Sequence, residues 1–151
     1  MYKRQGGSPI ETIDLTQLGY GIPRPVTYIP GTDQFATSFS NRPTFLDIVD
    51  RSGNLIDSFD LADLGVTEVR AVVYADSGLP RGGRFLINAA PGRRVLIADS
   101  SMNVVGEFDA YSEFGLTRIW FYNLVAVTSG EYAGTFGIIG DSGELIIFSI
   151  K

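Results

Sequence analysis

The stretch RRVLIADSSMNVVGEFD, residues Arg93–Asp109, decides the fold of this chain. Its two apolar runs flank a short polar segment, which is typical of two β-strands joined by a tight turn at Asp99–Asn103. The same arrangement occurs earlier as TFLDIVDRSGNLIDSFD, residues Thr44–Asp60, and in shorter form as TFGIIGDSGELIIFS, residues Thr135–Ser149. This recurrence predicts that one supersecondary unit is repeated along the chain.

A connector with a shared pattern follows each hairpin and gives the period of the repeat. The segments Ile13–Gly19, Phe59–Gly65 and Phe108–Gly115 each carry an aspartate near the start and end in glycine, and the third has one extra residue. They begin 46 and 49 residues apart, which is the spacing of β-propeller blades. Because no helical stripe of useful length occurs, we predict an all-β, partial β-propeller of about three four-stranded antiparallel blades.

The repeat also predicts the limits of each blade and of its strands. Blades are expected over residues 16–61, 62–110 and 111–151. Their strands are expected over residues 25–29, 35–39, 44–50 and 55–61, then 68–74, 84–88, 93–100 and 103–110, then 118–122, 124–129, 135–141 and 144–150. Apolar residues at repeated positions predict the core, namely Leu46, Ile48, Phe59, Leu96, Ile97, Phe108 and Phe148.

The first fifteen residues fit this scheme only in part. Gly7–Leu15 aligns with Gly53–Leu61, so we expect residues 6–15 to hold one orphan outer strand, over Ile10–Leu15, of a truncated blade. Residues 1–5, MYKRQ, have no apolar segment behind them as a signal peptide would. They look like a translated sequencing-adapter scar, and an ordinary N-terminus is the alternative.

Composition excludes several classes of function. The 151 residues are 44% hydrophobic and 12% aromatic, enough for a globular core, and the net charge of −5 without a basic cluster disfavours nucleic-acid binding. The chain has no histidine and no cysteine, which excludes disulfides, Cys or His zinc sites and His-dependent triads. No apolar run reaches the roughly 20 residues of a membrane span. The absence of cysteine suits an oxidising compartment and excludes none, and we expect a periplasmic or secreted location over a cytoplasmic one.

The hairpin around Asp99 resembles the NHL repeat, in which an apolar strand is followed by A-D-S-G-N and by a strand ending in F-D. The matching residues are Ala98, Asp99, Ser100, Asn103, Phe108 and Asp109, then Val49, Asp50, Ser52, Gly53, Asn54, Phe59 and Asp60, then Asp141, Ser142, Gly143 and Phe148. The resemblance covers about half of the chain. It implies a six-bladed propeller, a disc of four-stranded blades around a channel, whose relatives bind proteins, RNA or small ligands and include lactonases and lyases.

Three blades cannot close such a ring, because propellers have four to eight blades. The expected partners are therefore upstream blades missing from this sequence or a second copy of the chain. Missing blades are favoured, because pairing of two copies leaves the strand at Ile10–Leu15 unexplained and an uncovered apolar face invites aggregation.

Candidate binding residues follow from aligning the repeats on Gly19, Gly65 and Gly115. The alignment brings equivalent positions near the start of each innermost strand to the channel mouth, and we expect a ligand site there of Arg24, Glu68, Arg70, Arg118 and Trp120. Arginine suits a carboxylate or phosphate, and tryptophan offers a stacking surface. The alternative is that these are polar strand ends with Trp120 in the core.

Catalysis and metal binding have less support in the sequence. The acidic turns at Asp50 and Asp99 lack the alternating ligands of a calcium loop, so no cofactor is expected and calcium is only an alternative. Carboxylates such as Asp47, Asp57 and Glu107 are expected at exposed alternate positions and form no acid–base pair.

These observations predict a non-catalytic binding module, part of a larger six-bladed propeller, that presents its channel mouth to a protein or a small anionic ligand. The alternative is a lactonase-like hydrolase or lyase whose site is shared with missing blades.

Overall fold

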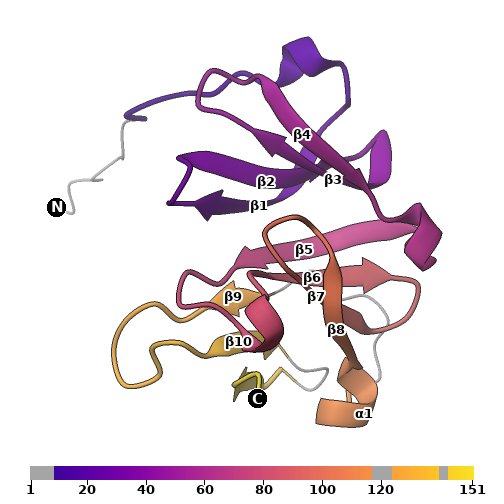
Figure 1. Cartoon of the computed structure of the whole chain (residues 1–151), viewed down its shortest axis with the longest axis vertical. Coiled ribbons are helices and arrows are strands. Elements are labelled where there is room, and N and C mark those ends of the chain that lie inside the picture. The colour runs from indigo at the N-terminus through magenta and orange to yellow at the C-terminus, as the bar shows by residue number, and fades with distance from the viewer. Residues whose placement is uncertain (1–8, 117–123, 140–142) are drawn as a thin grey trace, which may run out of the picture.

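The computed structural model describes residues 9–116, 124–139 and 143–151. These residues form three antiparallel sheets that stack face to face (Figure 1). The first sheet holds β1 (Pro23–Ile29), β2 (Gln34–Phe39), β3 (Arg42–Val49) and β4 (Leu55–Asp60) in chain order. The second holds β5 (Glu68–Tyr74), β6 (Phe85–Ala90), β7 (Arg94–Ala98) and β8 (Val104–Asp109).

The third sheet holds β9 (Val125–Ala126), β10 (Phe136–Ile139) and β11 (Leu145–Phe148). The strand expected over residues 118–122 lies outside the described residues, as do residues 1–8. Each strand pairs with the next along the chain, as in a β-meander, and the predicted all-β architecture of about three antiparallel blades is confirmed.

The segment Ile10–Leu15 does not form the strand that the repeat predicts. It pairs with no strand in the described part of the chain, and an extended segment without a ladder partner is not a strand. It lies instead beside the outer face of the first sheet, where Ile13 and Leu15 line a shallow cavity together with Val26. An ion pair of 2.7 Å between Glu11 and Arg51 fastens it there.

One-turn helices precede each of the three sheets along the chain. These are η1 (Thr16–Leu18), η2 (Ala62–Leu64) and α1 (Ala110–Phe114), and a further turn, η3 (Pro80–Gly82), lies in the loop between β5 and β6. The first three end at a glycine with left-handed backbone, at Gly19 (φ 67°), Gly65 (φ 76°) and Gly115 (φ 72°). The extra residue of the third connector turns a three-residue 3₁₀ helix into a five-residue α-helix.

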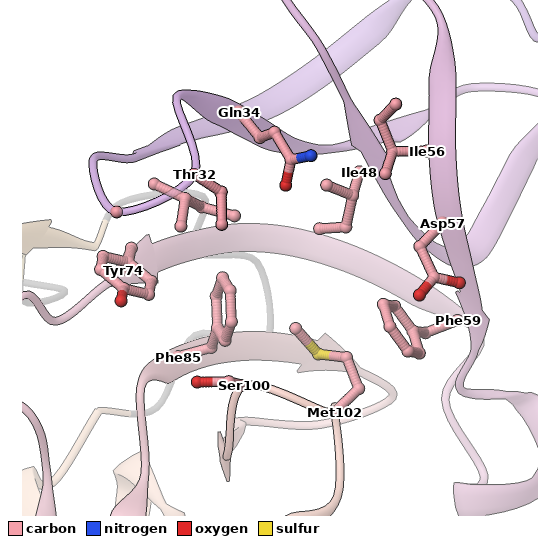
Figure 2. A pocket seen from close by; sticks show the side chains of 12 residues that line it. Thr32, Gln34, Ile48, Ile56, Asp57, Phe59, Tyr74, Phe85, Ser100 and Met102 are labelled. Carbon is pink, nitrogen blue, oxygen red and sulfur yellow. The ribbon is translucent and has the colours of Figure 1, made fainter.

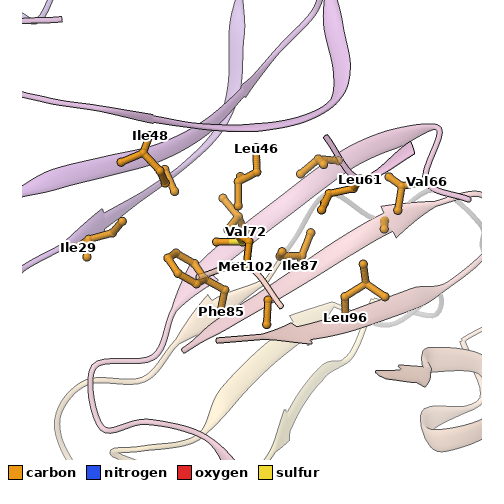
Figure 3. Close-up of a cluster of buried hydrophobic side chains, with 14 residues drawn as sticks. Ile29, Leu46, Ile48, Leu61, Val66, Val72, Phe85, Ile87, Leu96 and Met102 are labelled. Carbon is orange, nitrogen blue, oxygen red and sulfur yellow. The ribbon is translucent and has the colours of Figure 1, made fainter. Parts of the chain in front are cut away.

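Two hydrophobic clusters hold the three sheets together. The first lies between the first and second sheets and includes Leu46, Ile48, Val72, Ile87 and Leu96 (Figure 3). The second lies between the second and third sheets and is centred on buried residues of both, among them Ala71, Val73, Leu86, Phe136, Ile138 and Phe148. Of the predicted core, Ile97, Phe59 and Phe108 are half-buried and pack against these clusters.

The second sheet is therefore covered on both faces. On β5, Val72 faces the first sheet, whereas Ala71 and Val73 face the third. All six residues of β6 are buried, which explains why Phe85–Ala90 reads as an unbroken run of mainly apolar residues. This stacking brings the starts of β1 and β5 side by side (Figure 1).

Candidate functional site

Three of the five predicted site residues meet where β1 and β5 begin. A nitrogen of Arg24 (Nη1) donates to Glu68 Oε1 at 2.7 Å. Arg70 Nε lies 3.6 Å from the other oxygen, Glu68 Oε2. Arg24 comes from the first sheet and the other two residues from the second, so the group bridges two sheets. We call Arg24, Glu68 and Arg70 the arginine–glutamate cluster; Arg118 and Trp120 lie outside the described residues.

Both arginines occupy irregularities in their strands. The register of β1 against β2 shifts between Pro23 and Val26, and that of β5 against β6 shifts between Val69 and Ala71. An extra residue in one strand of a pair is a β-bulge, which redirects a side chain out of the regular alternation. Arg24 and Arg70, which the repeat alignment makes equivalent, are both placed in this way.

Exposure differs strongly within the arginine–glutamate cluster. The side chain of Arg24 is 50% exposed, that of Glu68 is 19% and that of Arg70 is 5%. Arg70 also donates from Nη1 to the backbone oxygen of Gly92 at 3.3 Å, which fixes it beneath the surface. Two guanidinium groups contact one carboxylate, and Arg24 is the member of the cluster that reaches solvent.

This arrangement can bind an anion. A guanidinium has five N–H donors in a fixed plane, and the contact of Arg24 Nη1 with Glu68 leaves other donors on a side chain that is 50% exposed. Carboxylate and phosphate groups match that donor geometry in two-pronged contacts. The cluster is thus suited to hold an acidic group at the end of the sheets, and it contains one carboxylate and no second acid for acid–base chemistry.

A buried ion pair that the sequence did not predict lies in the first sheet. Asp47, expected to be exposed, has no exposed surface, which corrects that prediction. Its carboxylate accepts hydrogen bonds from Arg42 Nη2 at 3.1 Å and Nε at 3.3 Å, and from the hydroxyl of Ser58. The guanidinium carbon of Arg42 lies 3.8 Å from the ring centre of Phe45 and 4.3 Å from that of Tyr20. Arg42 and its aromatic neighbours cover the carboxylate. The alternation of polar and apolar residues along β3 does not indicate that other side chains cover this one.

The acidic turns are organised by their own backbone. Asp50 Oδ1 accepts from the amides of Ser52 and Asn54, and Asp99 Oδ1 accepts from those of Ser101 and Asn103, all within 2.8–2.9 Å. Hydrogen bonds within the turns hold the pKa of each aspartate below its usual value, chiefly from the Asn54 backbone amide for Asp50 and from the Asn103 side chain for Asp99. These hydrogen bonds explain the acidic turns as Asx turns. In the described ranges, no three acidic, histidine or cysteine side chains gather as a metal site would require.

Comparison with known proteins adds information on the fold. No family model matches the sequence, and no curated protein matches it. Among solved structures, the chain is similar to BBS1N in complex with ARL6DN, with 14% identity and a TM-score of 0.60 over 87% of this chain. It is also similar to Sqt1 of Saccharomyces cerevisiae, with 11% identity and a TM-score of 0.51 over 85% of this chain. Both are β-propellers.

The fold is that of a partial β-propeller. The chain spans 38% of the length of BBS1N and 31% of that of Sqt1. At these identities the likeness concerns the fold alone. In propeller terms, the three sheets are blades, β1 and β5 are innermost strands, and the arginine–glutamate cluster lies where those strands begin. Within the described residues, no helix has the length and apolar character needed to cross a membrane.

Proposed function

We propose that this chain is a non-catalytic binding module, part of a larger six-bladed propeller of the NHL-like kind, and that its arginine–glutamate cluster holds an acidic group of a protein or small ligand. The observation that carries the proposal is the position of Arg24: it contacts Glu68 at 2.7 Å, and its side chain stays 50% exposed at the start of the innermost strands. BBS1N, a propeller of similar fold, was crystallised in complex with ARL6DN, which supports protein binding as one use of such a surface.

The ring is completed, in this proposal, by further blades of the same protein, with a second copy of the chain as the alternative. Two blade faces support this, because each exposes apolar side chains where a neighbouring blade would pack. On the third blade these are Val125 (54% exposed), Ile139 (48%), Leu145 (62%) and Ile147 (38%), and on the first blade Val26 (64%) and Tyr28 (41%).

The rival function, a lactonase-like hydrolase or lyase, requires several carboxylates and amides directed at one point. In the part of the chain that the structure describes, no such acidic group is gathered, and Glu68 is engaged by two arginines. The binding function rests instead on the donors of the arginine–glutamate cluster, which suit an acidic group.

Binding of two anionic probes to matched arginine variants tests the proposal. Inorganic phosphate represents a small ligand and a hexaglutamate peptide an acidic protein segment, and both are titrated at low salt because screening weakens exposed charge contacts. We expect Arg24→Gln to weaken binding about tenfold, since a hydrogen bond to a charged group contributes roughly 1.5 kcal/mol or more. The control, Arg81→Gln, removes an exposed arginine at the opposite end of the sheets and should leave the affinity within twofold.

The outcomes distinguish the two classes of ligand, and they also show whether an anion site exists at Arg24. Tighter binding of the peptide favours a protein partner, and tighter binding of phosphate favours a small ligand. Equal loss in both variants, or no saturable binding of either probe, contradicts an anion site at Arg24.

A further inference from the structure

A cavity of about 220 Å³ lies between the first and second blades, at the opposite end of the sheets from the arginine–glutamate cluster (Figure 2). Its walls come from the turn between β1 and β2, the end of β3 and the strand β4 on the first blade, and from the end of β5 and the start of β6 on the second. The turn between β7 and β8 closes the floor with Met102. Neither the proposed anion site nor the predicted site residues involve this cavity.

The cavity carries one uncompensated negative charge. Among its described lining residues, Asp57 is the only one with a charged side chain. Its carboxylate accepts a hydrogen bond of 2.8 Å from the amide of Ser58, and within the described residues it forms no ion pair. Figure 2 shows this carboxylate at one side of the space, next to Phe59. Asp57 is exposed to solvent, and a cationic group in the cavity could pair with its carboxylate.

Three aromatic rings line part of the space, and aliphatic side chains such as Ile29 and Ile48 line another part. Tyr74 and Phe85 form an edge-to-face pair with ring centres 5.2 Å apart, and Phe59 lies on the other side beside Asp57 (Figure 2). The faces of aromatic rings attract cations, most strongly where water is excluded. Phe85 is buried, while Tyr74 and Phe59 are half-buried, so the rings are partly shielded from solvent. A carboxylate with three rings is the chemistry that recognises an organic ammonium.

Met102 shapes the cavity at a cost in backbone conformation. It has a left-handed backbone (φ 63°) at the turn position where the first blade has Gly53 (φ 81°) and the third has Gly143 (φ 88°). Such a conformation is unfavourable for a residue with a side chain and persists where the surroundings enforce it. The thioether side chain is 8% exposed and enters the space between the blades, so this cavity has an apolar, polarisable floor that glycine could not provide.

The volume limits the size of the ligand. A cavity of about 150 Å³ accommodates benzene, and sites for drug-sized molecules begin near 300 Å³. The present cavity, at about 220 Å³, therefore has room for one ring and a short arm that carries the charge.

We propose that this cavity binds a small organic ammonium with one aromatic or branched apolar body. The ammonium group lies at Asp57, and the body lies among Phe59, Phe85 and Met102. Gln34 and the Tyr74 hydroxyl, which also line the cavity, offer further hydrogen bonds at its rim.

Titration of the chain with phenethylamine, followed by the NMR signal of the Met102 methyl group, tests this proposal. The chain has two methionines, so that signal is readily assigned. We expect a saturable ring-current shift with a Kd on the order of 1 mM, as suits a ligand of this size. Phenethyl alcohol, which lacks the charge, and ethylamine, which lacks the ring, should each bind more weakly.

A matched pair of variants separates specific from general electrostatic attraction. Asp57→Asn should raise the Kd for phenethylamine about fivefold, because it removes the charge and keeps the shape. Asp76→Asn removes an exposed charge at the same end of the sheets but outside the cavity, and should change the Kd less than twofold. An unmoved Met102 signal, equal effects of the two substitutions, or equal binding of phenethyl alcohol would overturn the proposal.

Discussion

Asp47 is a buried acidic residue of the first blade. Its carboxylate has no exposed surface and is held by Arg42 and Ser58, while the Arg42 side chain is 24% exposed. A buried ion pair is costly to assemble, and removal of one member leaves the other uncompensated. The stability of the first blade therefore depends on both members being present, although neither belongs to a ligand site.

Replacement of Asp47 by asparagine should lower the free energy of unfolding by about 3 kcal/mol, because the Arg42 charge loses its partner. Urea unfolding measures the change. The control, Asp76→Asn, alters an exposed side chain and should remain within about 0.5 kcal/mol of the parent. A loss from Asp47→Asn as small as that of the control would show that the pair is not a stabilising contact.

Two half-buried aspartates, Asp50 and Asp99, make stability depend on pH. The backbone amide of Asn54, followed by its side chain, lowers the pKa of Asp50, and the side chain of Asn103, followed by its backbone amide, lowers the pKa of Asp99. Each carboxylate is thus favoured in its charged form by folding. The resulting stability is fully present above the unfolded value of 3.8 and is lost as the pH falls through the lower, folded pKa.

We expect the melting temperature to fall as the pH drops below about 4, and the double variant Asp50→Asn, Asp99→Asn to show a shallower fall over the same range. Thermal unfolding followed by circular dichroism at a series of pH values measures both slopes. Parallel curves for parent and variant would assign the acid sensitivity to other groups.

The arginine–glutamate cluster shows what residue patterns can predict. Alignment on Gly19 and Gly65 made Arg24 and Arg70 equivalent, and the structure brings both beside Glu68 because the repeats share one backbone path. The bulges that redirect these arginines could not be predicted, since they depend on pairing with the next strand. The burial of Asp47 could not be predicted for a similar reason. The alternation of residues along a strand indicates on which face of the sheet a side chain lies, but not whether other side chains cover it there.

At the scale of elements, aromatic packing joins the second and third blades. Phe148 on β11 contacts Phe114 of α1 at 4.9 Å between ring centres, Phe136 on β10 at 5.9 Å and Phe108 on β8 at 6.1 Å. The Phe148 side chain thus packs against the helix α1 and against strands of two sheets. The interface should be more sensitive to this residue than to its exposed neighbours on the same strand.

Phe148→Ala should lower the free energy of unfolding by roughly 3–5 kcal/mol, the range for a large buried aromatic side chain. Leu145→Ala, on the same strand but 62% exposed, should change it by less than about 0.5 kcal/mol. Chemical denaturation of both variants gives the comparison, and similar losses would place Phe148 outside the core.

Strand positions were largely predictable, because each strand alternates or runs apolar between turn residues. The strand at β5 was predicted with the observed bounds, and the other strands of the described residues differ from expectation at their ends, most of all β9, which keeps two of six expected residues. The segment Ile10–Leu15 has the same residue pattern without forming a strand. Sequence pattern describes the ability to pair, whereas a strand also requires a neighbour with free backbone groups.

For the molecule as a whole, the two outermost blade faces determine whether the chain associates with other blades or other chains. The third blade exposes Val125, Ile139, Leu145 and Ile147 on neighbouring strands, and the outer face of the first blade exposes Val26 and Tyr28. Exposed apolar sheet faces favour association, either with further blades or with another copy of the chain. The isolated chain should therefore associate as its concentration rises.

The double substitution Ile139→Lys, Leu145→Lys should shift the mass seen by light scattering after size exclusion toward that of one chain. A control with two lysines at exposed apolar positions elsewhere, Val104 and Tyr111, should associate like the parent. A parent chain that stays monomeric at every concentration would argue against these faces as contact surfaces, and equal dispersal by both variants would attribute the effect to charge alone.

Coverage of the second blade on both sides has a consequence for how the molecule melts. Because successive residues of β5 belong to opposite interfaces, neither outer blade can separate without loosening the strand that also holds the other. The amide hydrogens of β6 should accordingly be the last to exchange with deuterium. Local breathing would begin at the outer blades and stop at this shared layer, so that the three repeats lose their structure together and not one by one.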